Sequence, residues 1–233
     1  MIEHRRYASL PGQDQPWLKA RHHISPAGQA RESLDRWGAL RAWDDDEIAP
    51  HGAIPFHAHA DMEIVTYVRE GVLTHRDDLG NSAETHAGDV QVMSAGTGIH
   101  HAEYNLRDSV ARVFQIWIEP DRTGGCPAWG RKAFPKSERA GQFVVLASGF
   151  ANDAEALPIR TRARVVGATM RKSRQLEYAM CSDRLSYVVA SSGRLLVNGV
   201  RLEERDGAAI RNVKSVILSA LMDTELVLVD VPA

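Results

Sequence analysis

Residues 56–63 read Phe-His-Ala-His-Ala-Asp-Met-Glu, and this stretch decides the fold. Side chains two positions apart on a β-strand point to the same face of the sheet. The imidazoles of His57 and His59 therefore project together when the segment is extended. A pair of histidines needs at least one more donor to hold a metal ion firmly, so the chain should supply further donors from another strand.

A second short segment, Ile-His-His-Ala-Glu at residues 99–103, offers those donors. The same alternation places His101 and Glu103 on one face of a strand and His100 on the other. All ten histidines of the chain lie within its first 101 residues. The two segments together predict a set of three histidines and one carboxylate in the first half of the chain.

This donor set favours a divalent transition metal. Neutral imidazole suits iron, copper, nickel and zinc, and a carboxylate adds negative charge without the softness of a thiolate. The two cysteines, Cys126 and Cys181, have no spacing that indicates a metal site or a disulfide framework. Four protein ligands leave coordination positions open, which favours an enzyme over a structural metal site.

The order of the motifs resembles a known family. An HxH pair followed by Glu63 resembles the first cupin motif, and the similarity continues through residues 64–71, 75–82 and 88–99. The run Ser-Ala-Gly-Thr-Gly at 94–98, placed before the His-Ala-Glu of the second segment, is typical of the pirin branch of the cupins. The chain thus resembles a pirin.

Two carboxylates compete for the fourth ligand position. Pirins resemble one another in taking this ligand from the second motif, which implies Glu103, with Glu63 in the layer behind the ligands. In the alternative, Glu63 coordinates the metal and Glu103 is the mobile base. Ser94 stands where most cupins have proline, and this departure is also typical of pirins.

The strand pattern predicts an all-β fold. Short runs of β-forming residues are separated by turn signals such as Asn198-Gly199. The predicted strands are 62–68, 72–76, 110–118, 143–147, 163–169, 184–190, 194–198, 216–221 and 225–231. Residues 119–141, rich in glycine and proline, are expected to form a connector or an extended arm between the domains.

The resemblance implies a bicupin, two β-barrel (jelly-roll) domains in tandem. We expect an N-terminal cupin with the metal site at 1–130 and a C-terminal cupin at 131–233, which lacks metal ligands because residues 102–233 contain no histidine. The net charge is −7 for residues 1–120 and +5 for residues 121–233, which favours association of the two halves.

A basic cluster in the second half could bind an acidic partner or nucleic acid. Its members are Arg160, Arg162, Arg164, Arg171, Lys172 and Arg174. No aromatic residues alternate with these side chains, so we expect a solvated or interdomain face, and nucleic acid is an unlikely partner. The chain shows no apolar run long enough to span a membrane and no leader peptide, and a cytoplasmic location is expected.

The resemblance also implies an activity. Bacterial pirin-like proteins are associated with quercetin 2,3-dioxygenase activity, which opens the central ring of a flavonol with O₂ and releases carbon monoxide. Glu103 or Glu63 would accept the proton of the flavonol 3-hydroxyl, and the metal would act as Lewis acid and template. Fe(II) is the first expectation for the metal, with copper, nickel, cobalt, manganese or zinc as alternatives.

Pirins are also described as regulatory metal-binding proteins that contact transcription or metabolic factors, and this remains the rival interpretation. A redox-sensing metal with a protein partner would then replace catalysis. The apolar residues expected to line the site are Ile54, Phe56, Met62, Met93, Phe114, Ile116 and Trp117. The seven other histidines are expected to be hydrogen-bonded or surface residues: His4, His22, His23, His51, His75, His86 and His100.

Overall fold

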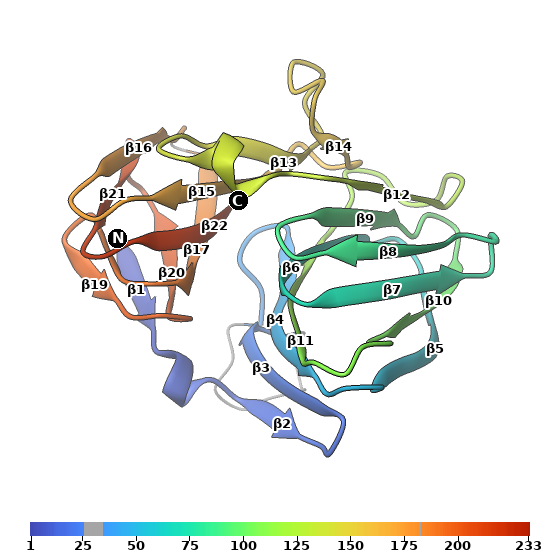
Figure 1. The fold of residues 1–233 in the computed structure, drawn as a ribbon. Helices are drawn as coiled ribbons and strands as arrows, with labels where there is room; N and C mark the ends of the chain where they lie inside the picture. The colour runs from blue at the N-terminus through green and yellow to red at the C-terminus, as the bar shows by residue number, and fades with distance from the viewer. Residues whose placement is uncertain (26–34, 182) are drawn as a thin grey trace.

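Two blocks of β-strands lie side by side, each built from a seven-stranded and a four-stranded sheet (Figure 1). This is a computed structural model, and it describes residues 1–25, 35–181 and 183–233. Two short 3-10 turns, η1 (Tyr7–Ser9) and η2 (Lys136–Arg139), are the helical elements of the described ranges. None of them approaches the length and apolar character of a membrane-spanning helix. The predicted all-β class is confirmed.

The first block contains the metal-ligand motifs. Its seven-stranded sheet runs in the order β12 (Ala128–Lys132), β9 (Val90–Ser94), β6 (Glu63–Glu70), β11 (Ala111–Ile118), β4 (Leu40–Ile48), β3 (Leu18–Ile24) and β2 (Gly12–Asp14). Its four-stranded sheet runs in the order β5 (Ala53–His59), β10 (Ile99–Tyr104), β7 (Val72–Asp77) and β8 (Ser82–His86).

The second block repeats this plan. Its seven-stranded sheet has the order β1 (Ile2–Arg5), β20 (Gly207–Arg211), β17 (Arg184–Ser192), β22 (Thr224–Pro232), β15 (Arg164–Met170), β13 (Val144–Ser148) and β14 (Leu157–Pro158). Its four-stranded sheet has the order β16 (Gln175–Ala179), β21 (Ser215–Ala220), β18 (Leu195–Val197) and β19 (Val200–Leu202). The N-terminal strand β1 pairs with β20, so the chain begins in the second block.

The nine predicted strands all correspond to observed strands, with ends that differ by one or two residues. Residues 119–141, expected to form a connector or an extended arm between the domains, contain one strand of the first sheet. β12 lies within this segment and pairs with β9 at the edge of the first sheet. An edge strand pairs with a neighbour on one side only. It can therefore form with fewer β-forming residues than a central strand, and its sequence is harder to recognise as a strand. The domain boundary at residue 130 stays a prediction.

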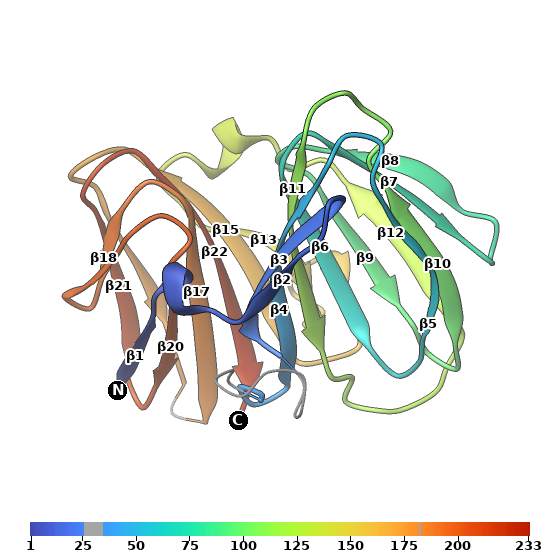
Figure 2. The ribbon, with the colours of Figure 1, turned by 90° about the horizontal axis from the view of Figure 1, so that it is seen from below.

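The two seven-stranded sheets face each other and bury an apolar core between the blocks (Figure 2). Alternation along β6 produces this arrangement. Val65 and Tyr67 pack in the core between the blocks, whereas Ile64 packs inside the first block. Central strands of the first sheet are therefore buried on both faces, which explains the nearly continuous burial of β6.

The interiors of the two blocks differ in chemistry. The inside of the second block is filled by aliphatic side chains such as Val188, Leu218 and Leu228, all fully buried. In the first block, buried polar groups occupy part of the interior, among them His101 and Glu103. A filled apolar interior has no donors for a metal, so the candidate site belongs to the first block.

His23 lies in the contact between the blocks and is fully buried. Its Nδ1 is 3.0 Å from the hydroxyl of Tyr187, and its ring makes an edge contact with Trp43. Burial, reinforced by nearby cationic side chains, lowers the pKa of His23 to about 3. The imidazole is therefore neutral in the folded protein at physiological pH.

We expect acid to weaken the protein through His23. The pKa of the folded-state imidazole lies below the unfolded value of about 6.5, so the unfolded chain binds the proton first and stability falls as pH decreases through this window. His23 alone should cost about 1.4 kcal/mol of unfolding free energy per pH unit well below pH 6.5. Urea unfolding of the metal-free protein and of H23Q between pH 7 and pH 4.5 measures this.

Glutamine can still bond Tyr187 but does not titrate, so the H23Q profile should be flatter than that of the wild type. Parallel profiles would show that His23 does not carry the effect.

Candidate metal centre

His57, His59 and His101 converge in the first block as predicted. His57 and His59 lie on β5, and β5 pairs with β10 so that His57 is directly opposite His101. The ring centroids are 4.7 Å apart for His57 and His59, 4.4 Å for His57 and His101, and 5.1 Å for His59 and His101. One nitrogen from each ring lies within 4.8 Å of the others. We call these three residues the outer group.

Burial increases from the mouth of the site inward. His57 and His59 are partly exposed, whereas His101 is 2% exposed. Burial, with smaller contributions from the neighbouring histidines, lowers the pKa of His59 to about 4 and that of His101 to about 3. These two imidazoles are therefore neutral at physiological pH, which is the form that binds metal ions.

The outer group has lone pairs that no protein group uses. Nδ1 of His57 is 2.8 Å from the carbonyl of Pro55, and since a carbonyl only accepts, this nitrogen donates and Nε2 is left with its lone pair. Both ring nitrogens of His101 are buried without a hydrogen-bond partner among the described residues. Buried polar atoms are rarely left unpaired, so this arrangement fits a bound cation.

Glu103 lies next to His101 on the same face of β10, as predicted, and is 1% exposed. Its two carboxylate oxygens accept hydrogen bonds from the side-chain amides of Gln91, at 2.7 Å, and Gln115, at 2.5 Å. Burial raises the pKa of Glu103 to about 7, although bonds from Gln91 and Thr66 oppose the shift. A carboxyl group with such a pKa can take up or release a proton near neutral pH.

Glu63 does not join these residues. Its carboxylate accepts hydrogen bonds from the hydroxyl of Ser94, at 2.6 Å, and from the backbone N–H of Arg160, at 3.1 Å. Along β6 it shares a face with Val65, which packs between the blocks, while Thr66, a partner of Glu103, lies on the opposite face. The geometry therefore places Glu63 outside the metal centre, in the contact between the blocks.

Some polar residues at the site were missed in the sequence. Gln91 and Gln115 hold Glu103, and His75 lies on β7 directly opposite Glu103. His75 was expected to be an ordinary hydrogen-bonded histidine. It does bond Asp77, but its ring centroid is also 5.3 Å from that of His101. The sequence pattern that indicates a place for His75 at the site is His75-x-Asp77, which has the same spacing as the HxE pattern of β10.

The predicted lining is only partly correct. Met62, Met93 and Trp117 pack together beside the site, and the indole of Trp117 makes an edge contact with His59 at 4.8 Å between ring centroids. Phe114 and Ile116, in contrast, face the core between the blocks, because they alternate with Gln115 and Trp117 along β11. Phe56 is 53% exposed and Ile54 packs with a separate cluster.

Six of the seven other histidines have carboxylate or hydroxyl partners away from the outer group, as predicted. The pairs are His4 with Asp206, His22 with Asp44, His23 with Tyr187, His51 with Asp108, His86 with Glu84, and His100 with Asp78.

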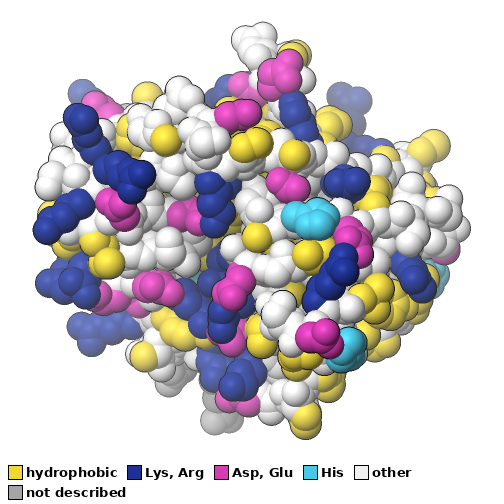
Figure 3. Space-filling model, viewed as in Figure 1, with side chains coloured by type: hydrophobic (Ala, Val, Ile, Leu, Met, Phe, Trp, Pro, Cys, Tyr) yellow, Lys and Arg dark blue, Asp and Glu magenta, His cyan; other side chains and the backbone are white. Residues whose placement is uncertain are grey.

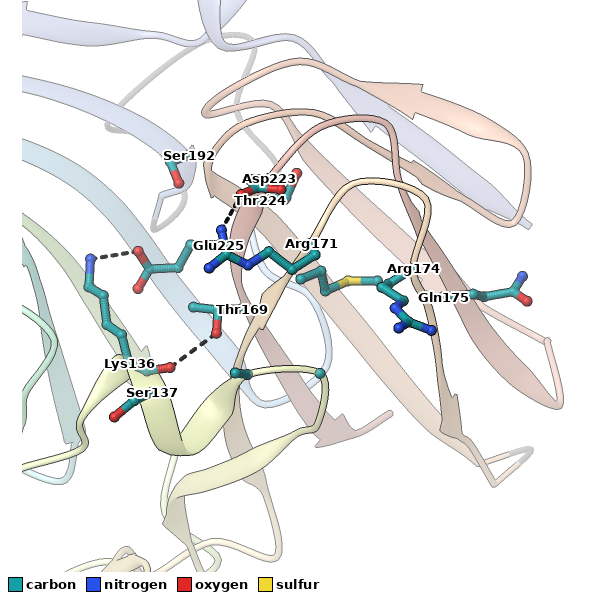
Figure 4. Close-up of a pocket in the computed structure, with 13 residues that line it drawn as sticks. Lys136, Ser137, Thr169, Arg171, Arg174, Gln175, Ser192, Asp223, Thr224 and Glu225 are labelled. Atoms are coloured by element: carbon teal, nitrogen blue, oxygen red, sulfur yellow. Dashed lines mark hydrogen bonds and ion pairs between the residues drawn. The ribbon is translucent and has the colours of Figure 1, made fainter.

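The predicted basic cluster is divided between ion pairs and the contact between the blocks. Arg164 pairs with Asp153 and Arg171 with Asp223, and Arg160 bonds Glu63 through its backbone. On the face seen in Figure 3, Lys and Arg side chains are densest over the second block. A cavity of about 740 Å³ opens there, with Lys136 paired to Glu225 on its wall (Figure 4). Its lining contains no histidine.

Comparison with known proteins identifies the family of the chain. Residues 4–118 match the family model Pirin, and residues 145–231 match the model described as quercetinase C-terminal cupin domain. The pirin-like protein of Caulobacter vibrioides is 56% identical over 230 residues, 99% of this chain and 99% of the relative. The quercetin 2,3-dioxygenase of Escherichia coli K12 is 33% identical over 217 residues, 93% of this chain and 92% of the relative.

A solved structure extends the similarity to the whole fold. The crystal structure of the bacterial pirin YhhW from Escherichia coli, in complex with nickel(II), superimposes with a TM-score of 0.92 at 31% identity and covers 100% of this chain and 99% of that chain. The predicted cupin fold is thereby confirmed.

Replacing His101 by alanine should remove the metal. We expect the affinity for nickel(II) to fall by more than about 100-fold. Loss of a residue that only supports a ligand weakens binding by up to about 100-fold, and loss of the ligand itself should weaken it further. The control is H100A, because His100 is the adjacent residue, is exposed and bonds only Asp78. Elemental analysis after dialysis measures the metal, and circular dichroism measures the fold. Equal metal content in H101A and the wild type would contradict the assignment.

Proposed function

The chain belongs to the pirin family, and on that premise we propose that it is a metal-dependent dioxygenase that opens the central ring of flavonols such as quercetin. Both atoms of O₂ would enter the ring-opened ester and one ring carbon would leave as carbon monoxide. His57, His59, His101 and Glu103 would hold the metal.

One observation carries this proposal more than the others. The three imidazoles of the outer group converge in the first block next to a buried carboxylate, and among the described residues neither ring nitrogen of His101 has a hydrogen-bond partner. Structural zinc sites are commonly closed by four ligands, often thiolates, and neither cysteine lies in this group. A site of histidines and one carboxylate, with its outer residues partly exposed, leaves room for a ligand from solvent.

The protein residues account for proton transfer and for the exclusion of water. Glu103 would accept the proton of the flavonol 3-hydroxyl, since it is a buried carboxylate whose oxygen lies within 4.8 Å of a ring nitrogen of His101. The amides of Gln91 and Gln115 fix the carboxylate in place. A bound divalent metal supplies Lewis acidity and a template for the oxyanion. Trp117 gives an apolar surface beside His59 for an aromatic ring.

The identity of the metal is part of the proposal. Imidazole and carboxylate ligands accept iron, nickel, cobalt, copper, manganese and zinc, so the donor set alone does not select one ion. We propose Fe(II) as the first choice because the resemblance to the pirins implies iron. Nickel(II) is the ion in the YhhW complex and is the natural alternative for loading experiments.

The two carboxylates give a direct test. E103Q keeps the shape of the side chain but removes the base, so quercetin turnover should fall by about 100-fold or more, within the usual contribution of a general base. E63Q should stay within about twofold of the wild type, because Glu63 bonds Ser94 and Arg160 instead. The loss of quercetin absorbance, at matched metal content, measures both. A dead E63Q with a nearly normal E103Q would reverse the assignment.

A further inference from the structure

His75 is a buried histidine that neither the outer group nor the proposed reaction uses. It lies on β7 directly opposite Glu103 on β10, and two residues later Asp77 lies opposite His101. The side chain of His75 is fully buried. Its ring stacks on that of Trp129, with the planes inclined by 11° and the centroids 4.8 Å apart. The ring is therefore held in one orientation beside the candidate centre.

The hydrogen bonds of His75 fix its tautomer. Nε2 lies 3.0 Å from Oδ2 of Asp77. Asp77 also accepts bonds from the side chain of Asn81 and from the backbone N–H groups of Leu79 and Asn81. An ionised carboxylate only accepts, so Nε2 of His75 carries the hydrogen and Nδ1 has the lone pair.

Nδ1 of His75 is buried and has no hydrogen-bond partner among the described residues. A histidine that donates from one ring nitrogen to a carboxylate and keeps the other as a free acceptor has the arrangement usual for metal ligands. Nε2 of His23 is likewise buried without a partner among the described residues, but His23 lies in the contact between the blocks, whereas His75 lies beside the donors His101 and Glu103. His75 thus has the features of a ligand without belonging to the outer group.

The donor atoms around His75 form a second group of three. One donor atom each from His75, His101 and Glu103 lies within 4.8 Å of the other two, and all three residues are buried. This group shares only His101 with the outer group. Two imidazoles and one carboxylate make a donor set that suits the same class of ions as the outer group.

We propose that His75, His101 and Glu103 form an inner coordination position for a divalent transition-metal ion, adjoining the outer group. Since His101 and Glu103 are also ligands of the metal in the proposed function, the two positions are alternatives for a single ion. Asp77 is a positioning residue that orients the His75 ring. The proposal rests on the proposed function, because both place the metal inside the first block. It adds His75 as a ligand and the inner position as a second location for the ion.

The test removes the outer position and asks whether binding remains. Metal-free H57A/H59A is titrated with nickel(II) by calorimetry and with cobalt(II) by visible absorption. We expect this variant to keep one equivalent of bound ion. Adding H75F should abolish the binding, because phenylalanine keeps the stack on Trp129 but has no ring nitrogen. Adding H86F instead should leave binding unchanged, since His86 is an exposed residue of β8.

D77N in the H57A/H59A background tests the same position without changing a donor atom. Loss of the carboxylate behind a metal-bound histidine typically weakens binding by about 10- to 100-fold, and we expect a decrease in this range. This variant also serves if H75F fails to fold, as judged by circular dichroism.

Two results would overturn the inner position: no nickel binding by folded H57A/H59A, or binding that survives both H75F and D77N. Neither result affects the proposed function, which instead fails if the wild-type protein binds no metal or does not consume quercetin. The two proposals can therefore fail separately.

Discussion

The central strands of the first seven-stranded sheet are buried on both faces, and this double burial determines where the side chains of the site point. One face packs against the second block, through residues such as Tyr67 and Phe114, and the other closes the interior that holds the candidate metal centre. Successive residues of β6 and β11 therefore serve two different environments. This alternation sends Gln115 toward Glu103 and its neighbours Phe114 and Ile116 toward the second block.

Burial also sets the chemistry of the site. It favours the uncharged form of each group, so it lowers the pKa of His59 and His101 and raises that of Glu103. The imidazoles are consequently ready to bind a cation, and the carboxyl group can exchange a proton near neutral pH. Among the described residues, the second block contributes no donor to the site. Its seven-stranded sheet instead packs against the first block through the apolar core between them.

The sequence was sufficient for the convergence of the outer group and for nine of the strands, because the HxH and HxE motifs obey the simple alternation of a β-strand. Other strands, such as β3, β4 and β20, were not predicted. It was not sufficient for Glu63, because alternation within one strand does not reveal which face meets the second block. Long-range pairing was also hidden: β1 joins the sheet of the second block, and His75 and Asp77 reach the site through pairing of β7 with β10. These features depend on contacts between segments distant in the chain, which local patterns do not encode.

Gas exchange during quercetin turnover tests directly whether the protein is a metal-dependent dioxygenase. Protein loaded with Fe(II) under anaerobic conditions is mixed with quercetin and O₂, and oxygen consumption and carbon monoxide release are recorded together, with H101A as the control. We expect equimolar oxygen consumption and carbon monoxide release in the wild type and neither in H101A. Bound metal without gas exchange would contradict the dioxygenase assignment and favour a regulatory role for the metal.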